Sequence, residues 1–148
     1  MIGLDTNALL RLLTDDDAAQ AELVRNRLAA LDATPESVLL NNVVLVETLW
    51  TLRRLYDFER SELQDLMEQL LSASTFCFEN RQVVTQATKL FQSGTADFSD
   101  CLIAAQNAAL GCESTVTLDK AMTGLPGVEL LRGKRQVRCR TLKNQSSC

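Results

Sequence analysis

The sequence contains no histidine among its 148 residues. This absence excludes Ser-His-Asp and Cys-His catalysis, and it excludes every metal site with a histidine ligand. The five cysteines are odd in number and include no Cys-x-x-Cys pair, which argues against a disulfide framework and a structural zinc site. Carboxylates, hydroxyls, amides and basic groups remain, so a bound metal is expected to be magnesium or manganese, which prefer oxygen ligands.

Long apolar runs are also missing. The longest candidate, 43–46, ends at Glu47, far short of the roughly 20 residues that a membrane-spanning helix requires. Residues 1–4 lead directly into Asp5 with neither the basic region nor the apolar segment of a signal peptide, so we expect a cytoplasmic protein. The hydrophobic fraction of 46% and charged fraction of 23% are typical of one globular domain.

The net charge of −4 conceals an uneven distribution. Residues 1–132 hold 10 of the bases and all 19 acids, a net charge of −9, whereas residues 133–148 hold five bases and no acid. The basic tail lacks apolar periodicity, and we expect it to be disordered. The tail either adds affinity for phosphate groups or is an extension that does not belong to the native protein.

Short apolar segments alternate with amphipathic ones along residues 1–132. We expect strands at 1–4, 37–40, 74–78, 114–118 and 128–131. Helices are expected at about 6–13, 15–31, 41–56, 59–72, 81–92 and 97–110, with a helical turn at 119–122. Gly111 favours the end of the helix expected at 97–110, because glycine is common directly after a helix. This alternation predicts one α/β domain over 1–132, a three-layer α/β/α arrangement around a parallel sheet.

Acidic residues recur at the carboxyl ends of the expected strands, where open α/β sheets bind ligands. Asp5 ends the first strand, Glu47 lies early in the helix after the second, and Asp119 follows the fourth. Asp100 lies in the first turn of its helix, with Asp97 one turn earlier on the same face. Several carboxylates in one cleft repel each other unless a divalent cation binds them, and such a cation can activate water against a phosphodiester.

Each acid also has a structural interpretation. Asp5, Asp97 and Asp119 could cap the helices that follow them. Glu47 could belong to a solvated helix face with Arg54. Asp100 is harder to explain in this way, because its helical neighbours have the character of packing residues. The joint placement of these acids, rather than any single one, favours a metal site.

Several motifs, taken together and in order, give the chain a family resemblance. They are Met-Ile-Gly-Leu-Asp-Thr-Asn at 1–7, Val-Glu at 46–47, Ala-Asp-Phe-Ser-Asp-Cys-Leu-Ile-Ala-Ala at 96–105, Thr-Leu-Asp-Lys at 117–120 and Leu-Pro-Gly-Val at 125–128. The chain resembles the PIN-domain ribonucleases over residues 1 to about 132, and within them the VapC toxins of prokaryotic toxin–antitoxin pairs. Each motif is weak alone, whereas the ordered set is specific.

The resemblance implies a five-stranded parallel sheet and an endoribonuclease that depends on Mg²⁺ or Mn²⁺ and attacks RNA with metal-activated water. It also implies a homodimer and a VapB-type antitoxin partner. Asp5, Glu47 and Asp100 match the core metal-binding acids, Asp119 matches a more variable fourth acid, and Asp97 matches an additional acid of one subgroup. Supporting roles fall to the polar residues Thr6, Asn7 and Thr117.

Few basic residues lie near these acids. Arg11, Arg53, Arg54 and Lys120 are the candidate RNA contacts, and ion pairs with local acids are the alternative role for such arginines. An antitoxin could lay an amphipathic helix in an apolar groove formed by the helices of 6–31 and 43–72, with one arginine against the acids. The alternative for those apolar side chains is ordinary core or dimer packing.

Three other functions compete with the toxin. The first is a PIN-domain nuclease of RNA processing that has no antitoxin. The second is a phosphatase with an aspartyl nucleophile, but that chemistry requires Asp-x-Asp at the first strand, where this chain has Asn7. The third is a non-catalytic binding module in which the acids only cap helices.

Overall fold

The computed structural model describes residues 1–31 and 33–133. In chain order the elements are β1 (Ile2–Gly3), α1 (Thr6–Leu13), α2 (Ala18–Ala29), β2 (Val38–Leu40), α3 (Asn42–Leu55), α4 (Arg60–Ser72), β3 (Phe76–Phe78), α5 (Arg81–Ser93), α6 (Phe98–Ala109), β4 (Thr115–Thr117), the 3-10 helix η1 (Lys120–Met122) and β5 (Val128–Leu130). Every expected strand and helix is present, shorter by a few residues at some ends. The basic tail at 134–148 lies outside the described residues.

Local side-chain chemistry accounts for the helix ends. Asp5, Asp17, Asn41 and Asn80 each accept a hydrogen bond from the backbone N–H three residues further along and so begin α1, α2, α3 and α5. After α6 the chain turns at Gly111, whose φ of 88° favours glycine. No helix among the described residues is long and apolar enough to cross a membrane.

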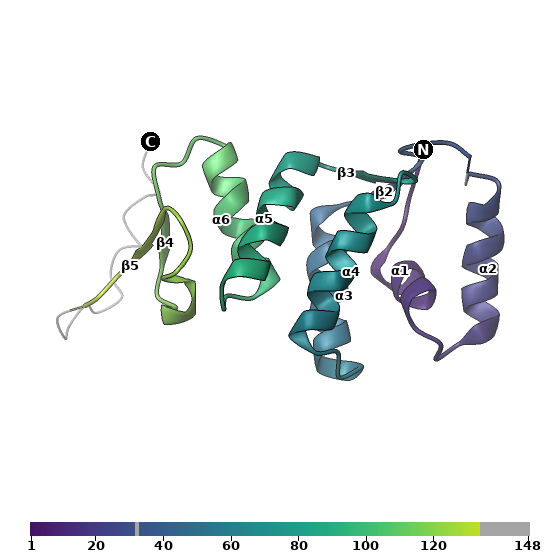
Figure 1. The fold of residues 1–148 in the computed structure, drawn as a ribbon, viewed down its shortest axis with the longest axis horizontal. Helices are drawn as coiled ribbons and strands as arrows, with labels where there is room; N and C mark the ends of the chain where they lie inside the picture. Colours follow the sequence, from purple (N-terminus) through teal and green to yellow (C-terminus); the bar gives the residue numbers. More distant parts are fainter. Residues whose placement is uncertain (32, 134–148) are drawn as a thin grey trace, which may run out of the picture.

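The five strands form two parallel sheets rather than one. One sheet has the order β1–β2–β3, and the other consists of β4 and β5. The expectation of a single five-stranded sheet is therefore wrong for one chain in this structure. The physical reason is that β1 pairs along one edge only, and the chain from α5 to β5 lies beyond β3 rather than beside β1 (Figure 1).

The hydrophobic core lies chiefly among α3, α4, α5 and α6. Leu45, Leu52, Met67, Val84 and Cys101 are essentially inaccessible to solvent. The same core cluster reaches α1 through Leu9 and the β4–β5 region through Met122 and Leu125. Figure 1 shows α1 and α2 at one end of the molecule, β4 and β5 at the other, and α3 to α6 between them.

Candidate active site

The first acidic group consists of Asp5 and Glu47, which Thr6 connects. One carboxylate oxygen of Asp5 accepts the Ala8 N–H at 2.8 Å, so Asp5 does cap α1. Thr6 Oγ1 donates a hydrogen bond to Glu47 Oε2 at 2.5 Å across the contact between α1 and α3. Because both carboxylates are exposed and each retains an oxygen that these bonds do not use, both can still bind a cation.

The second acidic group consists of Asp97, Asp100 and Asp119. Asp97 is the residue before α6, yet its side chain makes no capping hydrogen bond. Partial burial raises the pKa of Asp100 above the usual value, and the negative charges of Asp97 and Asp119 raise it further. Mutual repulsion of this kind is the electrostatic condition in which bound positive charge is favourable.

Cysteine chemistry beside this group is suppressed. Cys101 follows Asp100 directly, but its side chain is buried, and burial raises the pKa of the thiol to about 11. A thiol with that pKa stays protonated at neutral pH and is a poor nucleophile. The reactive side chains of this region are therefore the carboxylates.

The two acidic groups do not form one cleft within a single chain. Among the described residues, no set of three or more Asp, Glu or Cys side chains is arranged so that it could hold a metal ion. The donors have the oxygen chemistry that Mg²⁺ prefers, but one chain in this conformation does not gather enough of them. The expected convergence of Asp5, Glu47 and Asp100 is thus not seen, because Asp5 follows β1 and Asp119 follows β4, and these two strands belong to different sheets.

The supporting residues have distinct surroundings. Thr6 orients Glu47, as described above. Thr117 Oγ1 accepts the backbone N–H of Asp119 at 3.0 Å, and the Asp119 carboxylate then accepts the N–H of Ala121 at 2.8 Å. These contacts fix the chain where β4 ends and η1 begins. Asn7 is exposed, and its side chain makes no hydrogen bond within the part of the chain that the structure describes.

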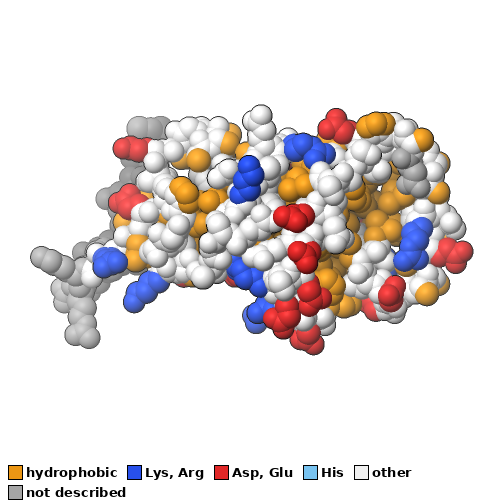
Figure 2. All heavy atoms as spheres, viewed as in Figure 1, with side chains coloured by type: hydrophobic (Ala, Val, Ile, Leu, Met, Phe, Trp, Pro, Cys, Tyr) orange, Lys and Arg blue, Asp and Glu red, His pale blue; other side chains and the backbone are white. Residues whose placement is uncertain are grey.

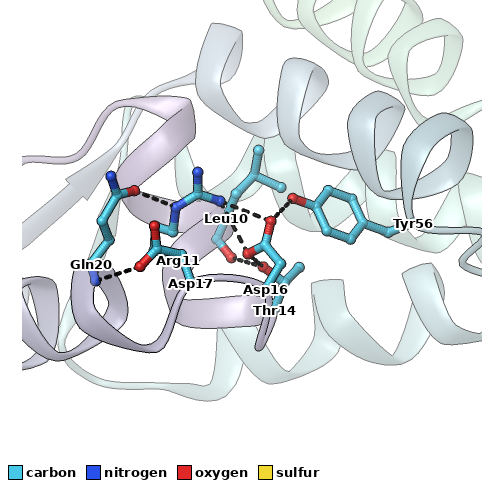
Figure 3. A network of polar contacts seen from close by, with 7 residues as sticks. All are labelled: Leu10, Arg11, Thr14, Asp16, Asp17, Gln20 and Tyr56. Carbon is cyan, nitrogen blue, oxygen red and sulfur yellow. Dashed lines mark hydrogen bonds and ion pairs between the residues drawn. The ribbon is translucent and has the colours of Figure 1, made fainter.

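The predicted RNA contacts are engaged to different degrees. Arg11 forms an ion pair with Asp16 at 3.1 Å and donates to Gln20, within a network that extends to Tyr56 (Figure 3). Arg53 lies 3.5 Å from Glu59 and donates to a backbone carbonyl, whereas Arg54 stacks over the Trp50 ring at 5.7 Å.

The fourth candidate RNA contact, Lys120, is exposed in η1. On the face drawn in Figure 2, acidic side chains run down the middle with basic side chains beside them, so this face offers no continuous basic surface.

A groove of about 380 Å³ runs between α3 and the start of α6. Its lining combines apolar and charged side chains: Val46, Leu49, Trp50, Arg53, Arg54, Arg60, Leu63, Phe91, Asp97, Phe98 and Ser99. The groove therefore places the predicted RNA contacts Arg53 and Arg54 beside Asp97 of the second acidic group. It also lies on the 43–72 helices that were expected to offer a docking groove.

Arg60 is a structurally important residue that the sequence reasoning missed. Its guanidinium donates to the carbonyl oxygens of Phe91, Thr95, Gly94 and Ala96 at 2.7, 3.3, 3.0 and 2.8 Å and stacks over the Phe91 ring. These bonds hold the loop that leads to Asp97. One signal was available in the sequence. The positive charge of Arg60 at the first position of α4 is unfavourable beside the positive end of the helix dipole, which indicates another role for this side chain.

Comparison with known proteins gives three findings. Residues 2–127 match the family of the PIN domain. A VapC ribonuclease of Aquifex aeolicus is 24% identical over 117 residues, which are 79% of this chain and 86% of that protein. A solved toxin–antitoxin complex from Klebsiella pneumoniae covers 86% of this chain and 94% of its own, with 19% identity and a TM-score of 0.32.

The family match spans nearly all of the described residues. It includes three of the motifs that carried the resemblance in full, all of the 1–7 motif except Met1, and Leu125 to Gly127 of the last. It includes all five acids, from Asp5 to Asp119, and the strands and helices that position them. The resemblance drawn from the sequence motifs is thus confirmed: the chain belongs to the PIN domain family.

Proposed function

We propose that this PIN-domain protein is an Mg²⁺-dependent endoribonuclease and the toxin of a VapBC-type pair. The observation that carries the proposal is a set of five acids on PIN motifs, in a chain that has no histidine to serve as a base. The similarity to a VapC ribonuclease over most of both chains supports the choice of RNA as substrate.

The proposed roles follow from the contacts of each carboxylate. With the two acidic groups brought together, Asp5, Glu47 and Asp100 would bind the cation, and Asp119 and Asp97 would complete its surroundings. Thr6 would keep Glu47 in one orientation through their hydrogen bond, and Thr117 would fix the backbone at Asp119. A bound Mg²⁺ or Mn²⁺ would supply water of lowered pKa and neutralise charge on the scissile phosphate.

RNA contacts are proposed for Arg53, Arg54 and Lys120. The first two line the groove that ends at Asp97, and the third follows Asp119 directly. Arg11 is the weakest of the four candidates, because Asp16 and Gln20 already engage its guanidinium. Each phosphate contact that is lost should weaken binding and reduce its dependence on salt concentration.

The groove also suits the proposed antitoxin. Trp50 is 59% exposed at its wall although it is a large apolar side chain. An amphipathic helix could bury this ring, and an arginine of that helix could pair with Asp97. Occupation of the groove would then block both the RNA contacts and the acids.

Cleavage of total RNA by the purified protein tests the activity. We expect cleavage in Mg²⁺ or Mn²⁺, none in EDTA, and a loss of at least about 100-fold in Asp5→Asn and Asp100→Asn. Asp15→Asn is the matched control, because Asp15 is an exposed acid outside both acidic groups and should leave cleavage unchanged. Cleavage in EDTA, or full cleavage by both site variants, would contradict the proposal and favour a non-catalytic binding module.

A second experiment distinguishes a toxin from an RNA-processing nuclease. The product of a short gene adjacent to that of this chain should co-purify with it and inhibit its cleavage of RNA. Trp50→Ala should weaken that inhibition, since it removes the apolar anchor of the groove. Cleavage that no such product inhibits would favour the processing enzyme.

A further inference from the structure

Every strand except β2 has an edge without a partner among the described residues, and at β1 and β4 the backbone groups on that edge can be identified. Ile2 of β1 and Leu4 after it donate their N–H groups to the carbonyls of Ser37 and Leu39 along β2, so the backbone groups of Gly3 point to the opposite edge. In β4, Thr115 donates to Gly127 and Thr117 accepts from Leu131, so the backbone groups of Val116 also point away from β5. Parallel sheets are normally covered, and such edges bind other strands.

The side chains of β4 and the residue after it indicate that this strand is meant to be covered. Val116 is 56% exposed and Leu118 is 81% exposed, although both belong to an apolar segment. Parallel sheets are normally covered on both faces, so apolar side chains on their strands are usually buried. The unpaired edge needs a neighbouring strand, and the exposed side chains need a covering layer, which the helices attached to that strand can supply.

The edge of β1 in the same chain is not within reach. The α6 helix is fixed by Phe98, Cys101 and Leu102, which are buried in the core. The link to β4 is only 110–114, which can span roughly 18 Å even when extended. The link is also folded back on α6, because Gly111 and Cys112 donate to carbonyls of that helix. Figure 1 shows β4 beyond α6, at the end of the molecule away from α1.

We propose that the free edge of β1 pairs in parallel with β4 of a second copy of this chain, and that the active site is completed by acids from both copies. A twofold exchange of this kind pairs the free edges of β1 and β4 in each copy at once, and β3 and β5 remain the outer strands. The resulting strand order would be β3–β2–β1–β4–β5, a five-stranded parallel sheet built from two chains.

The pairing would also bring the two acidic groups together. Asp5 follows β1 and Asp119 follows β4, and the carboxyl ends of neighbouring parallel strands meet at the same edge of a sheet. Asp5 and Glu47 of one copy would then face Asp100 and Asp119 of the other. This accounts for the absence of a metal-binding set within the described residues of one chain. The catalytic consequence rests on the proposed ribonuclease function, whereas the strand pairing does not.

Mixed dimers of two inactive variants test the shared site. Asp5→Asn and Asp100→Asn chains, each with its own tag, are co-expressed. In every mixed dimer both substitutions then lie in the same site, and the other site is intact. We expect the unfractionated mixture to recover about a quarter of the wild-type cleavage rate, because about half of twofold dimers are mixed. The matched control pairs Asp5→Asn with Glu47→Gln, in which both sites of a mixed dimer are altered and no activity should return. No recovery by the first pair, with an active wild type, would overturn the shared site.

A photo-crosslink tests the pairing without reference to activity. A photoreactive phenylalanine analogue replaces Val116, and mass spectrometry identifies the attached peptide. We expect attachment to residues 1–11 in a product of twice the chain mass, and no such attachment from the same group at Glu129 on β5. Attachment to residues 1–11 within a single chain, or none from position 116, would overturn the pairing. If the wild type cleaves no RNA, the proposed function fails, and the crosslink still decides on the pairing.

Discussion

Removal of the Arg60 side chain should destabilise the protein by detaching the loop that precedes α6. The guanidinium donates to four backbone carbonyls, and those of Phe91 and Ala96 are partly buried, with bonds of 2.7 and 2.8 Å. A hydrogen bond to a charged group contributes about 1.5 kcal/mol or more, so these two bonds contribute about 3 kcal/mol. Stacking on the Phe91 ring, 4.2 Å from its centre, adds about 0.5 kcal/mol.

Arg60→Ala should therefore lower the free energy of unfolding by about 3.5 kcal/mol, which corresponds to a fall of about 10 °C in Tm for a domain of this size. Urea titration followed by circular dichroism measures the change. Arg60→Lys keeps the charge but not the planar fork, so we expect roughly half of the loss. Arg25→Ala is the matched control, because Arg25 is an exposed helical arginine with no ion pair among the described residues. A loss below about 0.5 kcal/mol in Arg60→Ala would refute this reasoning.

Three smaller predictions test other parts of the chain. The hydroxyl groups of Tyr56 and Thr14 donate hydrogen bonds to Asp16 and hold its pKa below the usual value. The ionised Asp16 carboxylate therefore stabilises the folded chain above about pH 4, and this stabilisation is lost as the pH falls further. Asp16→Asn should therefore cost more stability at pH 7 than at pH 3 in urea titrations, and an equal cost at both would count against it. Thr48 Oγ1 is buried without a hydrogen-bond partner among the described residues, so Thr48→Val should leave stability unchanged or raise it by up to about 1 kcal/mol; a clear loss would reveal a partner. Gly111→Ala should cost about 1 kcal/mol in thermal unfolding because of the φ of 88°, whereas Gly124→Ala should cost little, and equal effects would contradict this account.

The capping interpretation of the acids and their proposed role in catalysis are compatible. Asp5 and Asp119 each use one carboxylate oxygen to cap the following helix, as the sequence suggested they could. Asp97 occupies a cap position but does not cap with its side chain, so its carboxylate is left available. Among the candidate RNA contacts, Arg11 and Arg53 form the local ion pairs that were the alternative role for these arginines.

The positions of the helices and strands were determined by the sequence itself. Capping residues such as Asp17, Asn41 and Asn80 act on backbone groups three residues away, and apolar periodicity reports one face of one element. Both signals are local, so they can be read without knowledge of the fold. The motifs that carry the acids are local in the same sense, and they indicated the PIN domain family before any contact was known.

Only the tertiary structure decided how these elements combine. Strand pairing depends on hydrogen bonds between backbone N–H and C=O groups of distant residues, and nearly every residue carries the same groups. The sequence of β4 therefore does not indicate whether β1 of the same chain lies beside it. The division of the acids into two groups follows from that pairing. The role of Arg60 was hidden for the same reason, because its partners are backbone carbonyls more than thirty residues away. The candidate acids were thus identified from local motifs, while whether they come together depends on which strands pair.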